Sequence, residues 1–291
     1  MGNDTLQLDD VANTVEVTGA GSGTATGTAG FTGIENINGG SSTDDFDLNG
    51  GTLAGDIDGG AGANSLQLDD TSNSVEVTSA DGGTATGIGG SFSSIGTISG
   101  GSMDDTIDLN GGTLSGTLAG GGGAGINSLT LDDVNNTVEI TSNDAGSATG
   151  ITGGFSDIDN ITGGSMNDTV TLNGGTLNGD LDGGAGGTNT LNLDNTANAV
   201  EVTGTDSGTA TGINAGAIGT GFSNIGNING NADTDSFDLN GGTLSGNITG
   251  GGTASDNSLQ LDDVDNTVEV TSDDDGTCLL YTSDAADESS S

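Results

Sequence analysis

The sequence predicts an all-β fold, a parallel β-solenoid with about 20 residues per rung and three rungs in each repeat. The first observation is an N-x-L-x-L-D pattern that recurs along the chain at Leu6, Leu66, Leu129, Leu191 and Leu259. The second is that apolar residues stand two apart in short segments, which is the period of a half-buried strand. The third is that glycine pairs, with Asp and Asn, separate these segments as turn residues.

The strands are predicted from the order of segments inside one unit. The second unit reads NSLQLDD, NSVEVTS, GTATG, SFSSIGTISGG, SMDDTIDLNGG and TLSGTLAGG, and the other units keep this order. Leu66 and Leu68 share one face of a strand, whereas Gln67 lies on the other. Val75 and Val77 repeat this alternation. We therefore expect a thin aliphatic core that also contains one Phe from each unit.

Two glycine pairs in each unit are expected to stack at one corner of successive rungs. A repeated corner crowds the backbone and requires positive φ angles, both of which favour glycine. The clearest examples are Gly39-Gly40 with Gly59-Gly60, and Gly100-Gly101 with Gly120-Gly121. The absence of proline fits a ladder in which nearly every backbone N–H donates to a neighbouring strand.

The domain organisation is predicted to be a single solenoid over residues 1–277. Its repeats cover residues 2–63, 64–126, 127–188, 189–256 and, as a partial copy, 257–277. Each fully buried side chain contributes only about 1.5 to 3 kcal/mol, so a single unit needs its neighbours to complete a core. A row of separate sandwich domains is disfavoured for the same reason. Residues 278–291 are expected to form a disordered tail.

The composition restricts the partners of this protein. Its 291 residues include no Lys, Arg or His and 43 Asp and Glu, which gives a net charge of −43. Without basic side chains it has nothing to neutralise nucleic-acid phosphates, and an anionic membrane surface would repel it. No apolar run is long enough for membrane insertion. Cations are therefore the expected companions of the chain.

The segments after the first glycine pair of each unit resemble the calcium-binding RTX nonapeptide G-G-x-G-x-D-x-U-x, where U is a large apolar residue. GGSSTDDFD places Asp44 and Phe46 at the aspartate and apolar positions, with Ser42 in place of glycine. The second corner carries Asn where the aspartate belongs. The resemblance implies one mixed Ca²⁺ site per unit, weak because a carboxylate is missing. The candidate ligands are Asp44 with Asn64, Asp105 with Asn127, Asp168 with Asn189, and Asp235 with Asn257. The alternative is that these residues only form turns by bonding their own backbone.

No enzymatic activity is predicted. The L-D-D segments, such as Asp69-Asp70, offer paired carboxylates, but they recur in the units at a strand end instead of marking one pocket. The absence of His excludes Ser-His-Asp triads and His-containing metal sites.

A longer pattern, F-S-x-I-x-x-I-x-G-G leading to D-x-I-D-L-N-G-G-T-L-x-G, resembles repeats of giant bacterial surface and secreted proteins of the adhesin and autotransporter-passenger type. The similarity covers residues 2–277. It implies a structural stalk, extracellular or on the cell surface, whose partners are other domains of a larger parent protein and, as further candidates, host or environmental glycans. The alternative is an RTX-like secreted module whose folding is coupled to calcium outside the cell. Residues 278–288, CLLYTSDAADE, are similar to translated sequencing-adapter read-through, so Cys278 is assigned no redox role.

Overall fold

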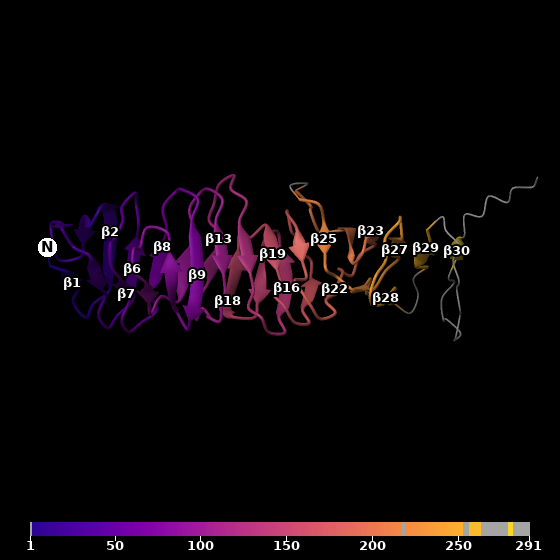
Figure 1. Cartoon of the computed structure of the whole chain (residues 1–291), viewed down its shortest axis with the longest axis horizontal. Helices are drawn as coiled ribbons and strands as arrows, with labels where there is room; N and C mark the ends of the chain where they lie inside the picture. Colours follow the sequence, from indigo (N-terminus) through magenta and orange to yellow (C-terminus); the bar gives the residue numbers. More distant parts are fainter. Residues whose placement is uncertain (1, 217–218, 253–255, 263–278, 282–291) are drawn as a thin grey trace, which may run out of the picture.

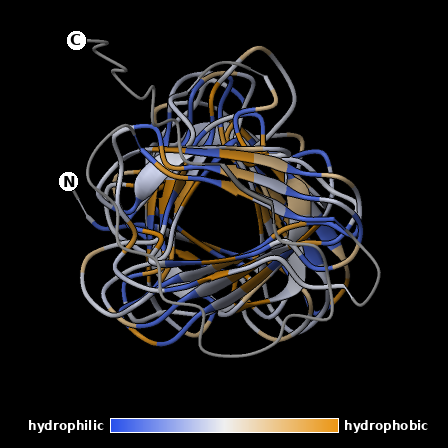
Figure 2. Ribbon diagram, turned by 90° about the vertical axis from the view of Figure 1, so that its right-hand side faces the viewer, coloured by the Kyte–Doolittle hydropathy of each residue, from blue (hydrophilic) through white to orange (hydrophobic). Residues whose placement is uncertain are grey.

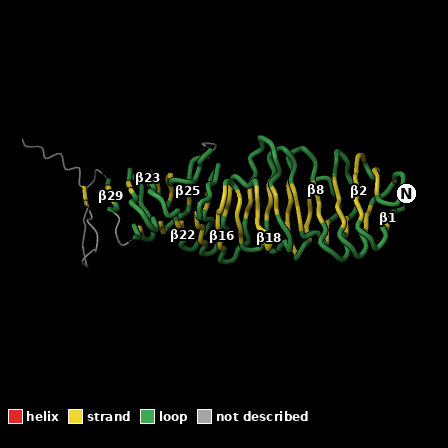
Figure 3. Tube along the Cα trace, turned by 180° about the vertical axis from the view of Figure 1, so that it is seen from behind, coloured by secondary structure: helices red, strands yellow, loops and turns green. Residues whose placement is uncertain are grey.

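The protein is an all-β rod built from two long sheets. The computed structural model describes residues 2–216, 219–252, 256–262 and 279–281, and these residues form 30 strands and no helix. The strands make sheets of 16 and 14 members that are mostly parallel, stacked along the rod in Figure 1 and joined by loops in Figure 3. None of these residues offers a helix that could cross a membrane.

Each of the first four units contributes seven strands. The first contributes β1 (Thr5–Gln7), β2 (Asn13–Gly19), β3 (Ser22–Ala25), β4 (Phe31–Thr32), β5 (Asn36–Asn38), β6 (Asp44–Asp47) and β7 (Ile57–Asp58). The second contributes β8 (Ser65–Gln67), β9 (Ser74–Ser79), β10 (Gly82–Ala85), β11 (Phe92–Ser93), β12 (Thr97–Ser99), β13 (Thr106–Asp108) and β14 (Leu118–Ala119). The third contributes β15 (Ser128–Thr130), β16 (Thr137–Ser142), β17 (Ala145–Ala148), β18 (Ile151–Ser156), β19 (Asn160–Thr162), β20 (Thr169–Leu172) and β21 (Leu181–Asp182). The fourth contributes β22 (Thr190–Asn192), β23 (Ala199–Gly204), β24 (Ser207–Ala210), β25 (Phe222–Ser223), β26 (Asn227–Asn229), β27 (Ser236–Asp238) and β28 (Ile248–Thr249), and the chain then adds β29 (Ser258–Gln260) and β30 (Leu279–Tyr281).

Successive units divide their strands between the two sheets in opposite ways. The first unit places β1, β5 and β7 in the 16-stranded sheet and β2, β3, β4 and β6 in the 14-stranded sheet, and the second unit reverses this division. The reason is that the chain crosses between the sheets five times in each unit, which is an odd number. Equivalent strands of neighbouring units therefore lie on opposite sheets.

The register corrects the predicted division into three rungs of equal length. In the 14-stranded sheet Phe46 pairs with Leu66, which lies one predicted rung further along the chain. Leu66 then pairs with Ile98, and the number of residues from Leu66 to Ile98 is more than one and a half times the number from Phe46 to Leu66. The predicted rung length is therefore right for some parallel neighbours and wrong for the others. The longer interval contains a hairpin, which the prediction of a purely parallel ladder omitted.

The hairpin belongs to an insertion of three antiparallel strands, and this insertion recurs in each of the first four units. In the second unit β9 pairs with β10, and β10 pairs with β11. Two residues, Ala80 and Asp81, connect β9 to β10, and Asp81 has φ 54°, as tight hairpin turns require. Gly83 of β10 lies so close to β9 that an added Cβ would stand 1.9 Å from the Glu76 carbonyl oxygen. This close approach accounts for glycine in the GTATG segment.

One continuous aliphatic core lies between the sheets. Val15 and Val17 of β2 are fully buried, whereas Glu16 between them is not, which confirms the predicted alternation. The buried apolar residues form a single cluster that extends from Leu8 to Phe237. Figure 2 shows the strands as walls around this interior, with the loops outside. Within the described residues the core therefore continues from each of the first four units into the next.

Three residues of the predicted tail form a strand. Leu279–Tyr281 form β30, which pairs in parallel with β29 at the end of the 16-stranded sheet. The expectation of a disordered tail over residues 278–291 stays a prediction. Cys278 and residues 282–291 lie outside the described residues.

Candidate functional site

The predicted glycine corners stack as expected. A Cβ added to Gly60 would stand 1.9 Å from the Gly40 carbonyl oxygen, and one added to Gly121 would stand 1.9 Å from that of Gly101. Gly60 has φ +74° and Gly121 has φ +99°, conformations that L side chains rarely adopt. These corners bring one coil of backbone into direct contact with the next.

The structure brings together each predicted pair of Asp and Asn residues. The backbone N–H of the aspartate donates to Oδ1 of the asparagine, at 2.9 Å from Asp44 to Asn64. The same bond is 2.9 Å for Asp105 with Asn127, 2.8 Å for Asp168 with Asn189, and 2.8 Å for Asp235 with Asn257. The prediction that an Asp corner stacks on an Asn corner is confirmed.

A third residue at each corner was missed by sequence reasoning. Asn13 donates to Asp44 Oδ1 twice, from its backbone N at 2.9 Å and from its side-chain Nδ2 at 2.7 Å. The equivalent residues of the other units are Asn73, Asn136 and Asn198. The sequence carries a signal for them, because an Asn stands two residues before the first Val of the V-E-[VI] segment in each unit. We call each triplet, such as Asn13, Asp44 and Asn64, an Asn–Asp–Asn ladder.

The ladder aspartates are buried charges without a cationic partner. Asp44, Asp105 and Asp235 are 0% exposed and Asp168 is 2% exposed. Burial raises the pKa of Asp168 and Asp235, and hydrogen bonds from Asn136 and Asn198 respectively act in the opposite direction. Because the chain contains no Lys or Arg, amide and backbone N–H groups are the donors that compensate these carboxylates.

The second carboxylate oxygen differs among the ladders. Oδ2 of Asp105 accepts a hydrogen bond from the Gly101 N–H at 2.9 Å. Oδ2 of Asp44, Asp168 and Asp235 is buried without a hydrogen-bond partner. A buried, unpaired carboxylate oxygen is destabilising, so we expect these three groups to lower the stability of the protein.

The ladder residues do not fit a calcium ion in this arrangement. Calcium takes six to eight oxygen ligands, whereas Oδ1 of each ladder aspartate faces the N–H groups of an asparagine. Within the described parts of the chain, no three Asp, Glu or Cys side chains gather closely enough to hold a metal ion. The amide oxygens of Asn64, Asn127, Asn189 and Asn257 already accept a backbone N–H.

We expect calcium and magnesium at equal millimolar concentration to shift the Tm of this protein equally. The physical reason is that both ions screen the acidic surface, while the ladders offer calcium no specific set of oxygens. The measurement is thermal unfolding followed by circular dichroism at constant ionic strength, with a chelator as reference. A saturable shift with calcium alone would show that the calcium sites implied by the RTX resemblance exist.

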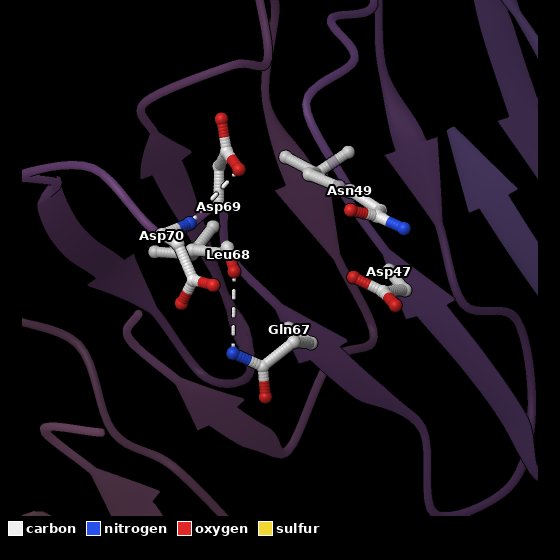
Figure 4. Close-up of a pocket in the computed structure, with 7 residues that line it drawn as sticks. Asp47, Asn49, Gln67, Leu68, Asp69 and Asp70 are labelled. Carbon is white, nitrogen blue, oxygen red and sulfur yellow. Dashed lines mark hydrogen bonds between the residues drawn. The ribbon is translucent and has the colours of Figure 1, made fainter. Parts of the chain in front are cut away.

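A shallow acidic depression lies on the outer surface. Figure 4 shows Asp47, Asn49, Gln67, Asp69 and Asp70 around it, and its volume is about 270 Å³. The Gln67 amide nitrogen donates to the Leu68 carbonyl at 3.2 Å, and the Asp70 backbone N–H donates to Asp69 Oδ1 at 2.8 Å. These local bonds hold the two acids of the L-D-D segment at the strand end.

Mutual repulsion of carboxylates marks this surface and its copy in the next unit. Burial, then Glu16, Asp69 and Asp70, raise the pKa of Asp47. In the second unit burial, then Glu76, Asp132 and Asp133, raise the pKa of Asp108. The same arrangement of acids around a partly buried Asp therefore recurs in two successive units.

An Asn side chain moderates this repulsion in each of the first four units. Asn49 donates to Glu16 Oε1 at 2.6 Å, and the same bond joins Asn110 to Glu76, Asn173 to Glu139, and Asn240 to Glu201. These Asn residues belong to the N-G-G turns. Neutral donors thus replace the Lys and Arg residues that would ordinarily pair with surface acids.

No family model, curated protein or solved structure matches this chain.

Proposed function

We propose that this protein is a structural repeat stalk of an extracellular, bacterial adhesin-like surface protein, and that its two sheets form a β-solenoid. The single observation that carries the proposal is the unbroken core cluster from Leu8 to Phe237. A rod with a continuous core keeps its units in line without a hinge between them, so it holds its two ends at a fixed distance. Sixteen strands at about 4.8 Å spacing correspond to a rod of about 70 Å.

The charge distribution supports a spacer exposed to a saline exterior. With 43 acidic and no basic side chains, copies of the rod repel one another and remain apart. The same repulsion is screened within about 8 Å at physiological salt, so the rod does not repel its own distant units. Its partners in this proposal are cations and the other domains of a parent protein, with surface glycans bound by those domains.

The calcium-coupled secretion module has no equivalent observation behind it. Oδ1 of each ladder aspartate already accepts from N–H donors, and the ladder places one carboxylate in each unit. The stalk is therefore the function that the geometry favours.

Duplication of residues 64–188 is expected to lengthen the rod by about 34 Å, since two units add seven strands to each sheet at a spacing of about 4.8 Å. The cross-section stays the same, because the added units continue the alternation between the sheets that the existing units already show. Small-angle X-ray scattering of the parent and lengthened chains measures both quantities. Duplication of residues 64–126 alone is the intermediate case, because it adds three strands to one sheet and four to the other and is expected to lengthen the rod by about 17 Å. A lengthened chain that bends or separates into independent globules contradicts the stalk.

A further inference from the structure

The side-chain nitrogen of the first ladder asparagine lies inside a cage of oxygen atoms. Nδ2 of Asn13 is 2.7 Å from Val11 O, 3.0 Å from Asp9 O, 3.2 Å from Gly39 O and 2.7 Å from Asp44 Oδ1. An amide has two hydrogens, so it cannot donate a full hydrogen bond to each of four acceptors. The cage contains more oxygen than an asparagine requires.

The same cage recurs in the other units. Nδ2 of Asn136 is 2.9, 3.0, 2.6 and 3.0 Å from the carbonyl oxygens of Asp132, Val134 and Gly163 and from Asp168 Oδ1. Nδ2 of Asn198 likewise has four oxygens, from Asp194, Thr196, Gly230 and Asp235. Nδ2 of Asn73 has three, from Asp69, Thr71 and Asp105. Each cage combines backbone carbonyls with one carboxylate.

The amide is held by its nitrogen and not by its oxygen. Oδ1 of Asn73, Asn136 and Asn198 is buried without a hydrogen-bond partner. Turning the amide over would place Oδ1 against the same oxygens, which would repel it. The surrounding oxygens therefore favour a group with positive charge density at this position. The neutral amide provides it through its N–H groups, but its own Oδ1 is left without a hydrogen bond, which is destabilising.

Backbone carbonyls and a carboxylate around one point are the ligands of a hard cation. We propose that Asn13, Asn73, Asn136 and Asn198 take the place of bound metal ions, so that each ladder supplies its own positive group and needs no ion. Removal of the amide then leaves a cation site with one negative charge. Three of the four nitrogen-to-oxygen distances at Asn136, 2.9–3.0 Å, exceed the 2.3–2.6 Å of calcium–oxygen bonds, so a larger, singly charged ion such as potassium also suits this cage.

The test is the Asn136→Ala variant of the full chain, compared with the wild type in three chloride salts at equal ionic strength. Tetramethylammonium is too large for the cage, whereas potassium and calcium can enter it. In tetramethylammonium chloride we expect the variant to lose about 5 °C in Tm, because a buried carboxylate loses its donor. We expect potassium or calcium to recover at least half of this loss. The wild type in the same salts gives the effect of the acidic surface, which is subtracted.

Asn189→Ala is the matched control because it truncates a buried asparagine of the same ladder. Asn189 contacts Asp168 through its Oδ1, and its Nδ2 has only the Asn224 and Gly184 carbonyls, at 2.9 and 3.5 Å. We expect this variant to lose stability in all three salts without recovery.

Asn136→Asp gives a second route to the same answer, because it places another carboxylate at the cage. We expect this variant to depend on the small cations more strongly than Asn136→Ala. If neither Asn136 variant recovers with potassium or calcium, or if Asn189→Ala recovers equally, the amide does not stand in for an ion.

Discussion

The free energy of unfolding of this protein is expected to rise as the pH falls from neutrality towards the ordinary aspartate pKa of 3.8. Each aspartate with a clearly shifted pKa, among the described residues, has it raised, and burial is the largest cause in every case: Asp47, Asp108, Asp144, Asp168 and Asp235. A folded-state pKa above the unfolded one means that the native state binds its proton more tightly. Stability from these groups is therefore fully present below the unfolded pKa and is lost as the pH rises through the folded pKa.

Two features make this effect larger than in most proteins. The chain has no Lys, Arg or His, so acidification removes negative charge without leaving positive side chains to repel one another. Ordinary acid denaturation also requires native ion pairs to break, and the sequence has no basic side chain to form them. Thermal unfolding measured from neutral pH down to about pH 4 tests the expectation.

The Asp168→Asn variant separates the buried ladders from the surface acids. It removes an ionisable group whose pKa is raised by burial, so we expect it to be more stable than the wild type at neutral pH and to show a flatter pH profile. About 1 M salt weakens repulsion at the surface, where the Debye length becomes about 3 Å, but leaves the burial effect. A stability maximum at neutral pH, with loss on mild acidification, would contradict this account.

Gly60→Ala is expected to destabilise the protein by about 4 kcal/mol or more, whereas Gly50→Ala is expected to cost about 1 to 2 kcal/mol. The two glycines have nearly the same backbone strain, with φ +74° and φ +75°. A Cβ at Gly60 would stand 1.9 Å from the Gly40 carbonyl oxygen, while a Cβ at Gly50 would meet nothing within 4 Å. The difference between the two variants therefore measures the contact between stacked corners.

Urea unfolding followed by circular dichroism gives both values, provided that the transition stays cooperative along the repeats. Gly121→Ala and Gly111→Ala repeat the comparison in the second unit, because an added Cβ meets the Gly101 carbonyl oxygen at 1.9 Å in the first and open space in the second. Equal losses of unfolding free energy within each pair of variants would mean that the stacked corners are not in contact in solution.

The corners were the part of the site most accessible from sequence. A glycine pair followed by Asp or Asn predicts both a tight turn and its stacking, because glycine is needed where backbones touch. The ladder asparagines Asn13, Asn73, Asn136 and Asn198 were missed although they recur, since an Asn before a strand is ordinarily only a turn residue. The oxygens around their side-chain nitrogens come from segments up to 37 residues away, as in Asn198 with Asp235, and no local pattern reports such a meeting.

The hairpins show a different kind of omission. Asp81 and Asp144 directly precede the second strand of their hairpins, and in the second unit Asp81 is followed by Gly82, a known hairpin signal. The predicted ladder of parallel rungs contained no hairpin. The hairpin lengthens the interval between the parallel neighbours Leu66 and Ile98 well beyond the interval from Phe46 to Leu66, and the uniform spacing is thereby lost.

The sequence by itself determined the all-β class, the in-and-out alternation of Val15, Glu16 and Val17, and the contact between Asp and Asn corners, because each depends on residues that are close in sequence or about one predicted rung apart. Only the tertiary structure decided which sheet a strand joins. Each unit crosses between the sheets an odd number of times, so equivalent strands alternate between them, and this parity is invisible in a repeat of nearly constant length. It also decided that an amide nitrogen, and not only a turn, stands beside each buried carboxylate.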